Sequence, residues 1–140
     1  MTAQPRLYVA GPLFDEGERW FQERLDALAV ECGYETFLPH RDNPDKTVET
    51  TGVIFRNNAT AIDDCSVVLA NLNGVMTDDG TAWEIGYAYA RNKPIVGLHT
   101  DWRMRFEHEI VNLMLEYSLD HLVRSLDELR TLLTELRTAD

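Results

Sequence analysis

The stretch Ser66-Val-Val-Leu-Ala70 decides the fold, because it is a nearly continuous apolar run rich in β-branched side chains. Such runs are typical of a strand that is buried on both faces of a sheet. A helical period follows over Thr81–Arg91, and a second apolar run, Pro94-Ile-Val-Gly-Leu-His99, comes shortly after it. The three segments predict a strand–helix–strand unit with two parallel strands.

The same alternation continues outward from this unit in both directions. Gly11-Pro12 ends the first apolar run, and Gly33 ends the first helical period, as a turn and a helix C′ glycine do. We expect further strands at Arg6–Ala10, Tyr34–Leu38 and His121–Val123, helices at Phe14–Cys32, Thr51–Asp64, Glu107–Tyr117 and from Ser125 onward, and a loop over Pro39–Thr50.

Strands that alternate with helices predict one α/β domain spanning residues 1–140. Right-handed crossovers then give a doubly wound, flavodoxin-like parallel sheet of about five strands, with helices on both faces. In such folds ligands bind beyond the carboxyl ends of the strands. The loops that follow the strands are therefore where we expect the functional site.

Composition excludes several classes of partner. The net charge of −11 would repel a phosphate backbone, so we expect no nucleic-acid binding. No apolar run reaches the roughly 20 residues that a membrane span needs, and the polar start of the chain lacks a signal-peptide core. With two cysteines far apart, Cys32 and Cys65, we expect a cytoplasmic protein with reduced, structural thiols.

Glu84 is the acid that most needs an explanation. It lies among Ala, Trp, Ile and Gly in the segment Asp78-Asp-Gly-Thr-Ala-Trp-Glu-Ile-Gly-Tyr-Ala88, where an unpaired carboxylate is costly. One interpretation is a capping box, in which Thr81 is the N-cap and Glu84 bonds back to it. The other is a nucleophile, kept ionised by the helix dipole and able to form a covalent glycosyl-enzyme, as in retaining glycosidases.

Other familiar sites are absent from the sequence. Gly11 stands without the further glycines of a dinucleotide or P-loop motif, no serine lies in a nucleophile elbow, and the four histidines lack metal-ligand spacing. We therefore expect neither a metal nor an organic cofactor. A hypothesis from another class is a non-catalytic small-molecule sensor on a flavodoxin-like scaffold, or a response-regulator-like Mg²⁺ site, although Ala10 and Ala70 stand where that site needs acids.

Three segments, in order and suitably spaced, resemble the nucleoside 2-deoxyribosyltransferase family. Leu7-Tyr-Val-Ala-Gly-Pro-Leu-Phe14 is similar to its first strand and turn, Asp78-x-Gly-x-x-x-Glu84-x-Gly to its catalytic segment, and Val111-Asn-Leu-Met-Leu115 to its late Asn-Leu-Met segment. The resemblance implies a nucleotide-salvage transferase. Its partners are 2′-deoxynucleosides and free purine or pyrimidine bases, and it exchanges the base with retention at C1′.

The resemblance also implies roles for the catalytic residues. Glu84 is expected to attack C1′ of the deoxynucleoside, and Tyr8 to hydrogen-bond and orient Glu84. Asp78 is expected to bind a deoxyribose hydroxyl, although a capping role is the alternative. Gly80 belongs to the same catalytic segment and is expected to contact substrate.

Further residues are implied to bind substrate. Gly11 and Phe14 are expected to line the pocket, with Gly11 allowing close backbone approach. Asn112 is expected to reach a neighbouring subunit's site and bind the 5′-hydroxyl, which requires a homo-oligomer, a dimer or a multiple of one. A helix-surface asparagine is the alternative for Asn112.

The sequence departs from the family at Asn58, where many members carry Asp. An amide cannot deliver a proton to the departing base, although it still donates and accepts hydrogen bonds. Asp63 is a nearby alternative acid, although a solvated carboxylate at the helix end is the simpler interpretation of it. The runner-up within the family is a deoxynucleotide N-glycosidase, but the carboxylates of Asp78 and of the segment 15–18 would repel a phosphate, so we predict unphosphorylated substrates.

Overall fold

One parallel sheet organises the computed structural model, which describes residues 3–139 of the chain. The described strands run in the order β2-β1-β3-β4-β5, which is the flavodoxin-like, doubly wound order. Their bounds are β1 (Arg6–Ala10), β2 (Glu35–Phe37), β3 (Val67–Asn71), β4 (Ile95–Leu98) and β5 (His121–Val123). The predicted fold class is therefore confirmed.

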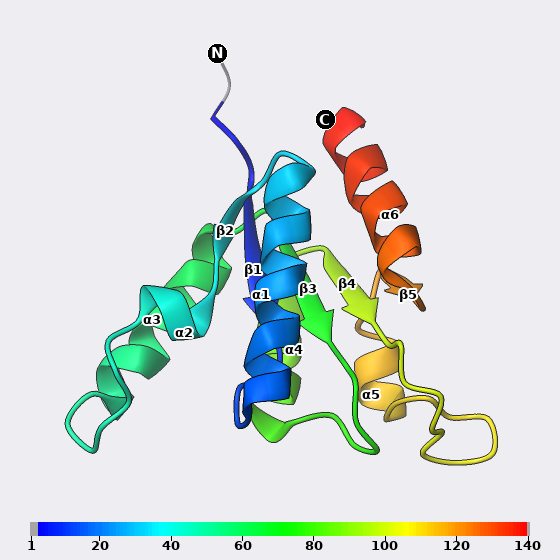
Figure 1. Cartoon of the computed structure of the whole chain (residues 1–140), viewed down its shortest axis with the longest axis horizontal. Coiled ribbons are helices and arrows are strands. Elements are labelled where there is room, and N and C mark those ends of the chain that lie inside the picture. Colours follow the sequence, from blue (N-terminus) through cyan, green and yellow to red (C-terminus); the bar gives the residue numbers. More distant parts are fainter. Residues whose placement is uncertain (1–2, 140) are drawn as a thin grey trace.

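Helices cover both faces of this sheet. α1 (Glu16–Glu31) and α6 (Leu126–Thr138) lie on one face, and α3 (Thr51–Asp64) and α4 (Asp79–Ala90) lie on the other, as Figure 1 shows. Two short helices, α2 (Pro39–Asp42) and α5 (Leu113–Glu116), lie in the connections after β2 and β4. The chain thus has three layers, with the sheet in the middle.

The pleat of β1 determines which side chains reach each helical layer. Leu7 and Val9 pack into the core under α1 and α6, whereas Tyr8 and Ala10 pack into the core under α3 and α4. This follows from the two-residue period of a strand. Tyr8 is fully buried, and its side chain lies on the same side of the sheet as α4.

The carboxyl ends of the strands meet at the lower edge of the sheet in Figure 1, and the first and last described residues lie toward the opposite edge. From β1 the chain turns one way to β2 and then the other way to β3. The point between β1 and β3 is therefore the topological switch of the sheet, where doubly wound folds bind ligands.

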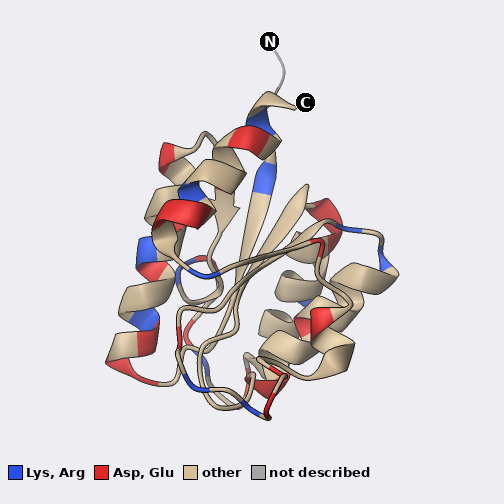
Figure 2. Cartoon of the chain, turned by 90° about the vertical axis from the view of Figure 1, so that its right-hand side faces the viewer, with Lys and Arg blue, Asp and Glu red and all other residues tan. Residues whose placement is uncertain are grey.

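Charged residues lie mainly on the helices and loops of the molecule, as Figure 2 shows. The strands between the two helical layers are largely uncharged because they are buried, and β3 is buried along its whole length. No helix among residues 3–139 is long and apolar enough to cross a membrane.

Two of the predicted segments differ in the structure. The expected loop 39–50 begins with the helical turn α2, which has Pro39 at its first position, and the Asp42 carboxylate accepts a hydrogen bond from the Leu38 amide at 2.9 Å. The expected helix 107–117 is helical only over α5. Phe106 and Glu109 form an antiparallel bridge instead, and Asn112 caps the shorter helix.

Candidate active site

An open groove of about 450 Å³ lies between α3 and α4. α3 contributes Phe55 and Asn58, which are three positions apart and so share a helix face. The start of α4 contributes the rest of the lining, namely Asp79, Gly80, Trp83 and Glu84. The groove thus contains Glu84, Gly80 and Asn58 from the predicted site residues.

The Tyr8 hydroxyl donates a hydrogen bond to the Glu84 carboxylate. The two residues are 76 positions apart in the sequence, and the pleat of β1 brings them together under α4. The Tyr8 ring stacks on Phe37 with ring centroids 5.5 Å apart and planes 11° apart. Phe37 therefore restricts the ring whose hydroxyl holds Glu84.

Burial raises the pKa of Glu84 from its usual 4.5 to about 8. Burial thus opposes the ionised form that we expected the helix dipole to favour. α4 begins at Asp79, so Glu84 lies in the second turn, whereas the dipole acts mainly within the first. The hydrogen bond from Tyr8 favours the ionised form and opposes the effect of burial.

An aromatic wall lies beside Glu84. The rings of Phe55 and Trp83 have centroids 5.2 Å apart and planes tilted by 59°, and Trp83 stacks on Tyr87 at 5.0 Å and 8°. Phe55 is 56% exposed and Trp83 is 44% exposed. Both rings therefore present free surface to the groove, where a flat heterocycle can stack.

Asp78, and not Thr81, is the N-cap of α4. Oδ2 of Asp78 accepts hydrogen bonds from the amide and the hydroxyl of Thr81, both at 2.9 Å. The predicted capping box of Thr81 and Glu84 is therefore wrong, because Thr81 lies inside the helix and Glu84 bonds to Tyr8. Asp78 therefore makes the contacts expected of a helix cap, which was the alternative role considered for it. The other carboxylate oxygen of Asp78, Oδ1, has no hydrogen-bond partner among residues 3–139.

Gly11 and Phe14 lie outside the lining of this groove. A Cβ at Gly11 would lie 2.5 Å from Nε2 of the buried Gln22, so Gly11 allows the close approach of α1 to the end of β1. Phe14 is 72% exposed. Their roles toward substrate stay predictions.

Asn112 also lies outside the groove that contains Glu84. Its side chain accepts a hydrogen bond from the Met114 amide at 2.8 Å and caps α5. It lines a neighbouring hollow together with Met76, Asp79 and Met114. Asp79 borders both openings, which places Asn112 beside the groove and not inside it.

Asp63 is engaged elsewhere and does not serve as the alternative acid. Its carboxylate accepts hydrogen bonds from the Tyr87 hydroxyl at 2.9 and 3.0 Å and pairs with Arg91 at 2.7 Å. These contacts, the Tyr87 hydroxyl first, lower the pKa of Asp63 below its usual value. A carboxyl held ionised in this way has no proton to donate to a departing base.

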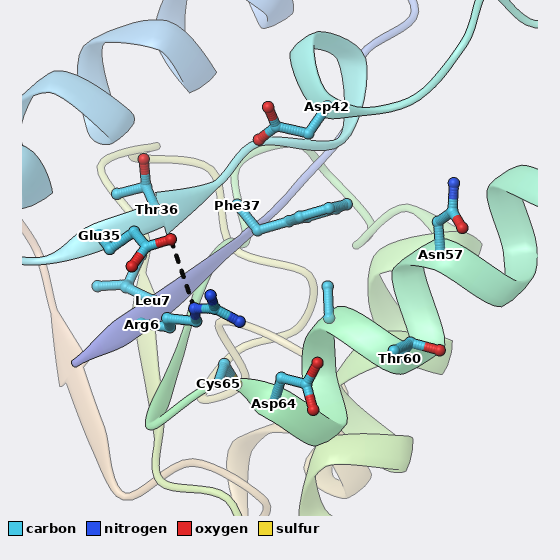
Figure 3. Close-up of a pocket in the computed structure, with 11 residues that line it drawn as sticks. Arg6, Leu7, Glu35, Thr36, Phe37, Asp42, Asn57, Thr60, Asp64 and Cys65 are labelled. Atoms are coloured by element: carbon cyan, nitrogen blue, oxygen red, sulfur yellow. Dashed lines mark ion pairs between the residues drawn. The ribbon is translucent and has the colours of Figure 1, made fainter. Parts of the chain in front are cut away.

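A second cleft, of about 410 Å³, lies between the edge strand β2 and the end of α3, and Figure 3 shows it. Its charged groups are largely paired, since Arg6 lies 3.4 Å from Glu35 and Asp42 lies 2.7 Å from Arg41. Its thiol, Cys65, is buried, and burial raises its pKa to about 11. We therefore place the candidate active site at the Glu84 groove.

No group of three or more His, Cys, Asp or Glu side chains within residues 3–139 is arranged to hold a metal ion. The groove brings Glu84 together with the amide of Asn58, and Tyr8 bonds to Glu84 from beneath α4. Phe55, Trp83 and Asp79 were not singled out from the sequence. Two signals in the sequence could have identified the aromatic residues. Trp83 is next to Glu84, and Phe55 lies three positions before Asn58, on the same helix face.

The fold and the groove define a parallel α/β protein whose site, between α3 and α4, combines a buried carboxyl with an aromatic wall. The sequence profile of the family described as "Nucleoside 2-deoxyribosyltransferase" matches residues 7–114. The chain therefore belongs to the nucleoside 2-deoxyribosyltransferase family.

Solved structures share the fold at low sequence identity. A 2-deoxyribosyltransferase from Bacillus psychrosaccharolyticus is 23% identical, with a TM-score of 0.77, over 89% of this chain and 90% of that one. A 2-deoxyribosyltransferase from Leishmania mexicana is 23% identical, with a TM-score of 0.74, over 94% and 97%. A CMP N-glycosidase from Clostridium botulinum is 22% identical, with a TM-score of 0.57, over 91% and 96%.

Proposed function

We propose that this protein exchanges the nucleobase of 2′-deoxynucleosides through a covalent deoxyribosyl–Glu84 intermediate. The observation that carries the proposal is the groove itself. It joins a carboxylate bonded by Tyr8, a pair of exposed aromatic rings and a polar amide. Family membership supports the same class of reaction.

In the first step an oxygen of the ionised Glu84 attacks C1′ from the face opposite the base. The C1′–N bond breaks, and its electron pair leaves with the base. The transition state resembles an oxocarbenium ion, which a neighbouring carboxylate stabilises. Deoxyribose suits this step because it has no 2′-hydroxyl to withdraw electrons from C1′.

In the second step a ring nitrogen of an incoming base attacks C1′, and the C1′–O bond to Glu84 breaks. The electron pair returns to the carboxylate, and the two inversions give net retention. Tyr8 orients Glu84 in both steps, because its hydroxyl donates to the carboxylate. Trp83 and Phe55 are suited to stack on the base.

Recognition of the sugar uses groups at the edges of the groove. Oδ1 of Asp78 is available to accept a hydrogen bond from a deoxyribose hydroxyl, since the cap uses Oδ2. Asn112 lies outside its own subunit's groove, which agrees with a role in a neighbouring subunit. Glu16 and Glu18 lie in the first turn of α1 with Asp15 as its cap. They lie outside the lining of the groove, and we expect their negative charge to disfavour the approach of a 5′-phosphate.

Hydrolysis of the same substrates is the second candidate, because the groove is open to water and one structural relative is an N-glycosidase. In that case water, not a base, resolves the intermediate.

Incubating deoxyinosine with adenine distinguishes these functions by chromatography. Deoxyadenosine together with hypoxanthine is the result expected for transfer, and hypoxanthine with free deoxyribose indicates a hydrolase. An unchanged mixture would contradict both reactions for this substrate and favour a sensor.

Glu84→Gln should lower the rate of base exchange by about three orders of magnitude or more. Comparable turnover of dAMP and deoxyadenosine would contradict the preference for unphosphorylated substrates.

A further inference from the structure

Three asparagine side chains form a hydrogen-bonded chain beside the groove. Nδ2 of Asn43 donates to the backbone carbonyl of Pro39 at 3.0 Å and to Oδ1 of Asn58 at 2.7 Å. Oδ1 of Asn43 in turn accepts from Nδ2 of Asn57 at 3.1 Å. Figure 3 shows Asn57 on α3, on the side that faces the segment carrying Asp42, just before Asn43.

The direction of this chain is fixed at one end. A backbone carbonyl only accepts hydrogen bonds, so the group that Asn43 turns toward Pro39 must be its NH2. The same NH2 reaches Asn58, which must then present its amide oxygen to Asn43. Nδ2 of Asn58 is left over, and it has no hydrogen-bond partner among the described residues.

Asn58 lines the Glu84 groove. Its NH2 keeps both donors free, whereas its oxygen, which has two lone pairs, already accepts one hydrogen bond from Asn43. An amide left unconstrained can present either its oxygen or its NH2 to a ligand. The hydrogen bond from Asn43 restricts that choice, because turning the Asn58 amide over would place two NH2 groups against each other. An NH2 donor matches a ring nitrogen with a lone pair or a carbonyl oxygen on a nucleobase.

We infer that Asn58, positioned by Asn43, is the specificity-determining residue for the base, and that it selects bases presenting a hydrogen-bond acceptor. This inference rests on the proposed function. When the C1′–N bond breaks, its electron pair makes the base an anion, and the Asn58 NH2 donates a hydrogen bond to an acceptor atom of that anion. Asn58 transfers no proton, so the released base takes its proton from solvent.

Binding of free bases tests the selection without requiring turnover. The Glu84→Gln protein is titrated calorimetrically with hypoxanthine and with its 3-deaza and 7-deaza analogues, in which one ring acceptor becomes a C–H. At least one analogue should bind about tenfold more weakly, or about 1.4 kcal/mol. Equal affinity for all three bases, or no binding of any, would overturn the inference.

Adding Asn43→Ala to that protein should reduce the discrimination several-fold, because Asn58 is then free to rotate. Asn57→Ala is the matched control. It also removes one hydrogen bond to Asn43 but leaves the bond to Asn58, so the discrimination should persist. Discrimination that survives Asn43→Ala in a protein with an unchanged melting temperature would show that Asn43 does not position Asn58.

Departure of the base gives a second readout in the protein with Glu84 intact. 5-Fluoro-2′-deoxyuridine and 2′-deoxyuridine have nearly the same shape, but the fluorinated base is the more stable anion. We expect the fluorinated base to be released several-fold faster than uracil. Asn58→Asp should reduce this difference between the two release rates, because a carboxyl can supply a proton to the departing base. Equal release rates in the unsubstituted protein would contradict departure as an anion.

The two sets of results separate the inference from the proposed function. If the deaza analogues bind weakly but no deoxynucleoside is cleaved, the proposed function fails and the selection of acceptor-bearing bases by Asn58 stands. If deoxynucleosides react but the Asn43 and Asn58 variants keep the selectivity, the proposed function stands and this inference fails.

Discussion

Two opposing influences act on the Glu84 carboxyl. Burial raises its pKa to about 8, and the Tyr8 hydroxyl donates a hydrogen bond that favours the carboxylate. A nucleophile must be ionised, so the balance between these influences sets the pH range in which Glu84 can attack C1′.

We therefore predict that kcat/KM for base exchange rises with pH up to about 8, as the free enzyme loses the Glu84 proton. Tyr8→Phe removes a hydrogen bond to the ionised form, so it should raise this pKa and lower the activity most at the acid end. The measurement is a pH–rate profile from pH 5 to 10 for both proteins.

The stability of the fold provides the control for this assignment. The folded-state pKa of Glu84 lies above its usual 4.5. Between pH 4.5 and about 8, the folded protein therefore binds more protons at this residue than the unfolded chain does. Its contribution to the free energy of unfolding should therefore fall as the pH rises from about 4.5 to 8. Glu84→Gln should remove that part of the slope. An activity plateau already reached at pH 6 would contradict the assignment.

At the scale of the element, the first turn of α4 combines a helix cap with a groove wall. Asp78 caps the helix through Oδ2, while Gly80 and Glu84 of the same helix line the groove. The capping carboxylate thereby fixes the position of the helix that carries Glu84.

Substitutions at Asp78 separate capping from substrate binding. Asp78→Ala should lower the free energy of unfolding by about 1 kcal/mol, whereas Asp78→Ser keeps a capping oxygen and should lose less. If Asp78 also binds the sugar, both variants should lose activity at least tenfold. Denaturant melts and initial rates measure the two effects.

The matched control is Ser125→Ala, because Ser125 caps α6 away from the groove. It should cost a similar amount of stability and leave the rate unchanged. Full activity of Asp78→Ser would show that Asp78 serves the helix alone.

At the scale of the whole molecule, the surface around α5 is unusually apolar for an exposed face. Phe106, Leu113, Met114 and Tyr117 are between 55% and 83% exposed, and Asn112 lies among them. Patches of this kind often mark protein–protein contacts. They are consistent with a second copy of the chain covering this face and bringing its Asn112 toward the Glu84 groove.

Mixed dimers test this arrangement. A dimer purified from co-expressed Glu84→Gln and Asn112→Ala chains with different tags contains one groove with both residues intact, if Asn112 acts across the interface. We expect about half of the wild-type rate per dimer, measured as base exchange. Each variant dimer by itself should be strongly impaired.

A mixed dimer as inactive as its parents would place Asn112 in its own subunit's site. A protein that stays monomeric at working concentrations, by light scattering, would exclude the arrangement altogether.

Local pattern was sufficient for much of the fold. Five apolar runs and the helical periods between them predict the strands and main helices, because burial on both faces of a sheet demands such runs. The pattern predicted the wrong helix boundaries where a contact of one side chain outweighs the helix propensity of the segment. Asn112 starts α5 late in a segment whose composition suggests a longer helix, and Pro39 with Asp42 closes a turn inside an expected loop.

The sequence by itself determined the α/β class and drew attention to Glu84, since a carboxyl in an apolar segment needs a partner or a use. Only the tertiary structure decided which partner it has, because the pleat of β1 and the packing of α4 bring Tyr8 to it across 76 positions. Burial in that packing, which no local pattern encodes, also raises its pKa. The same holds for Asn58, whose amide is oriented by Asn43 through contacts between α2 and α3.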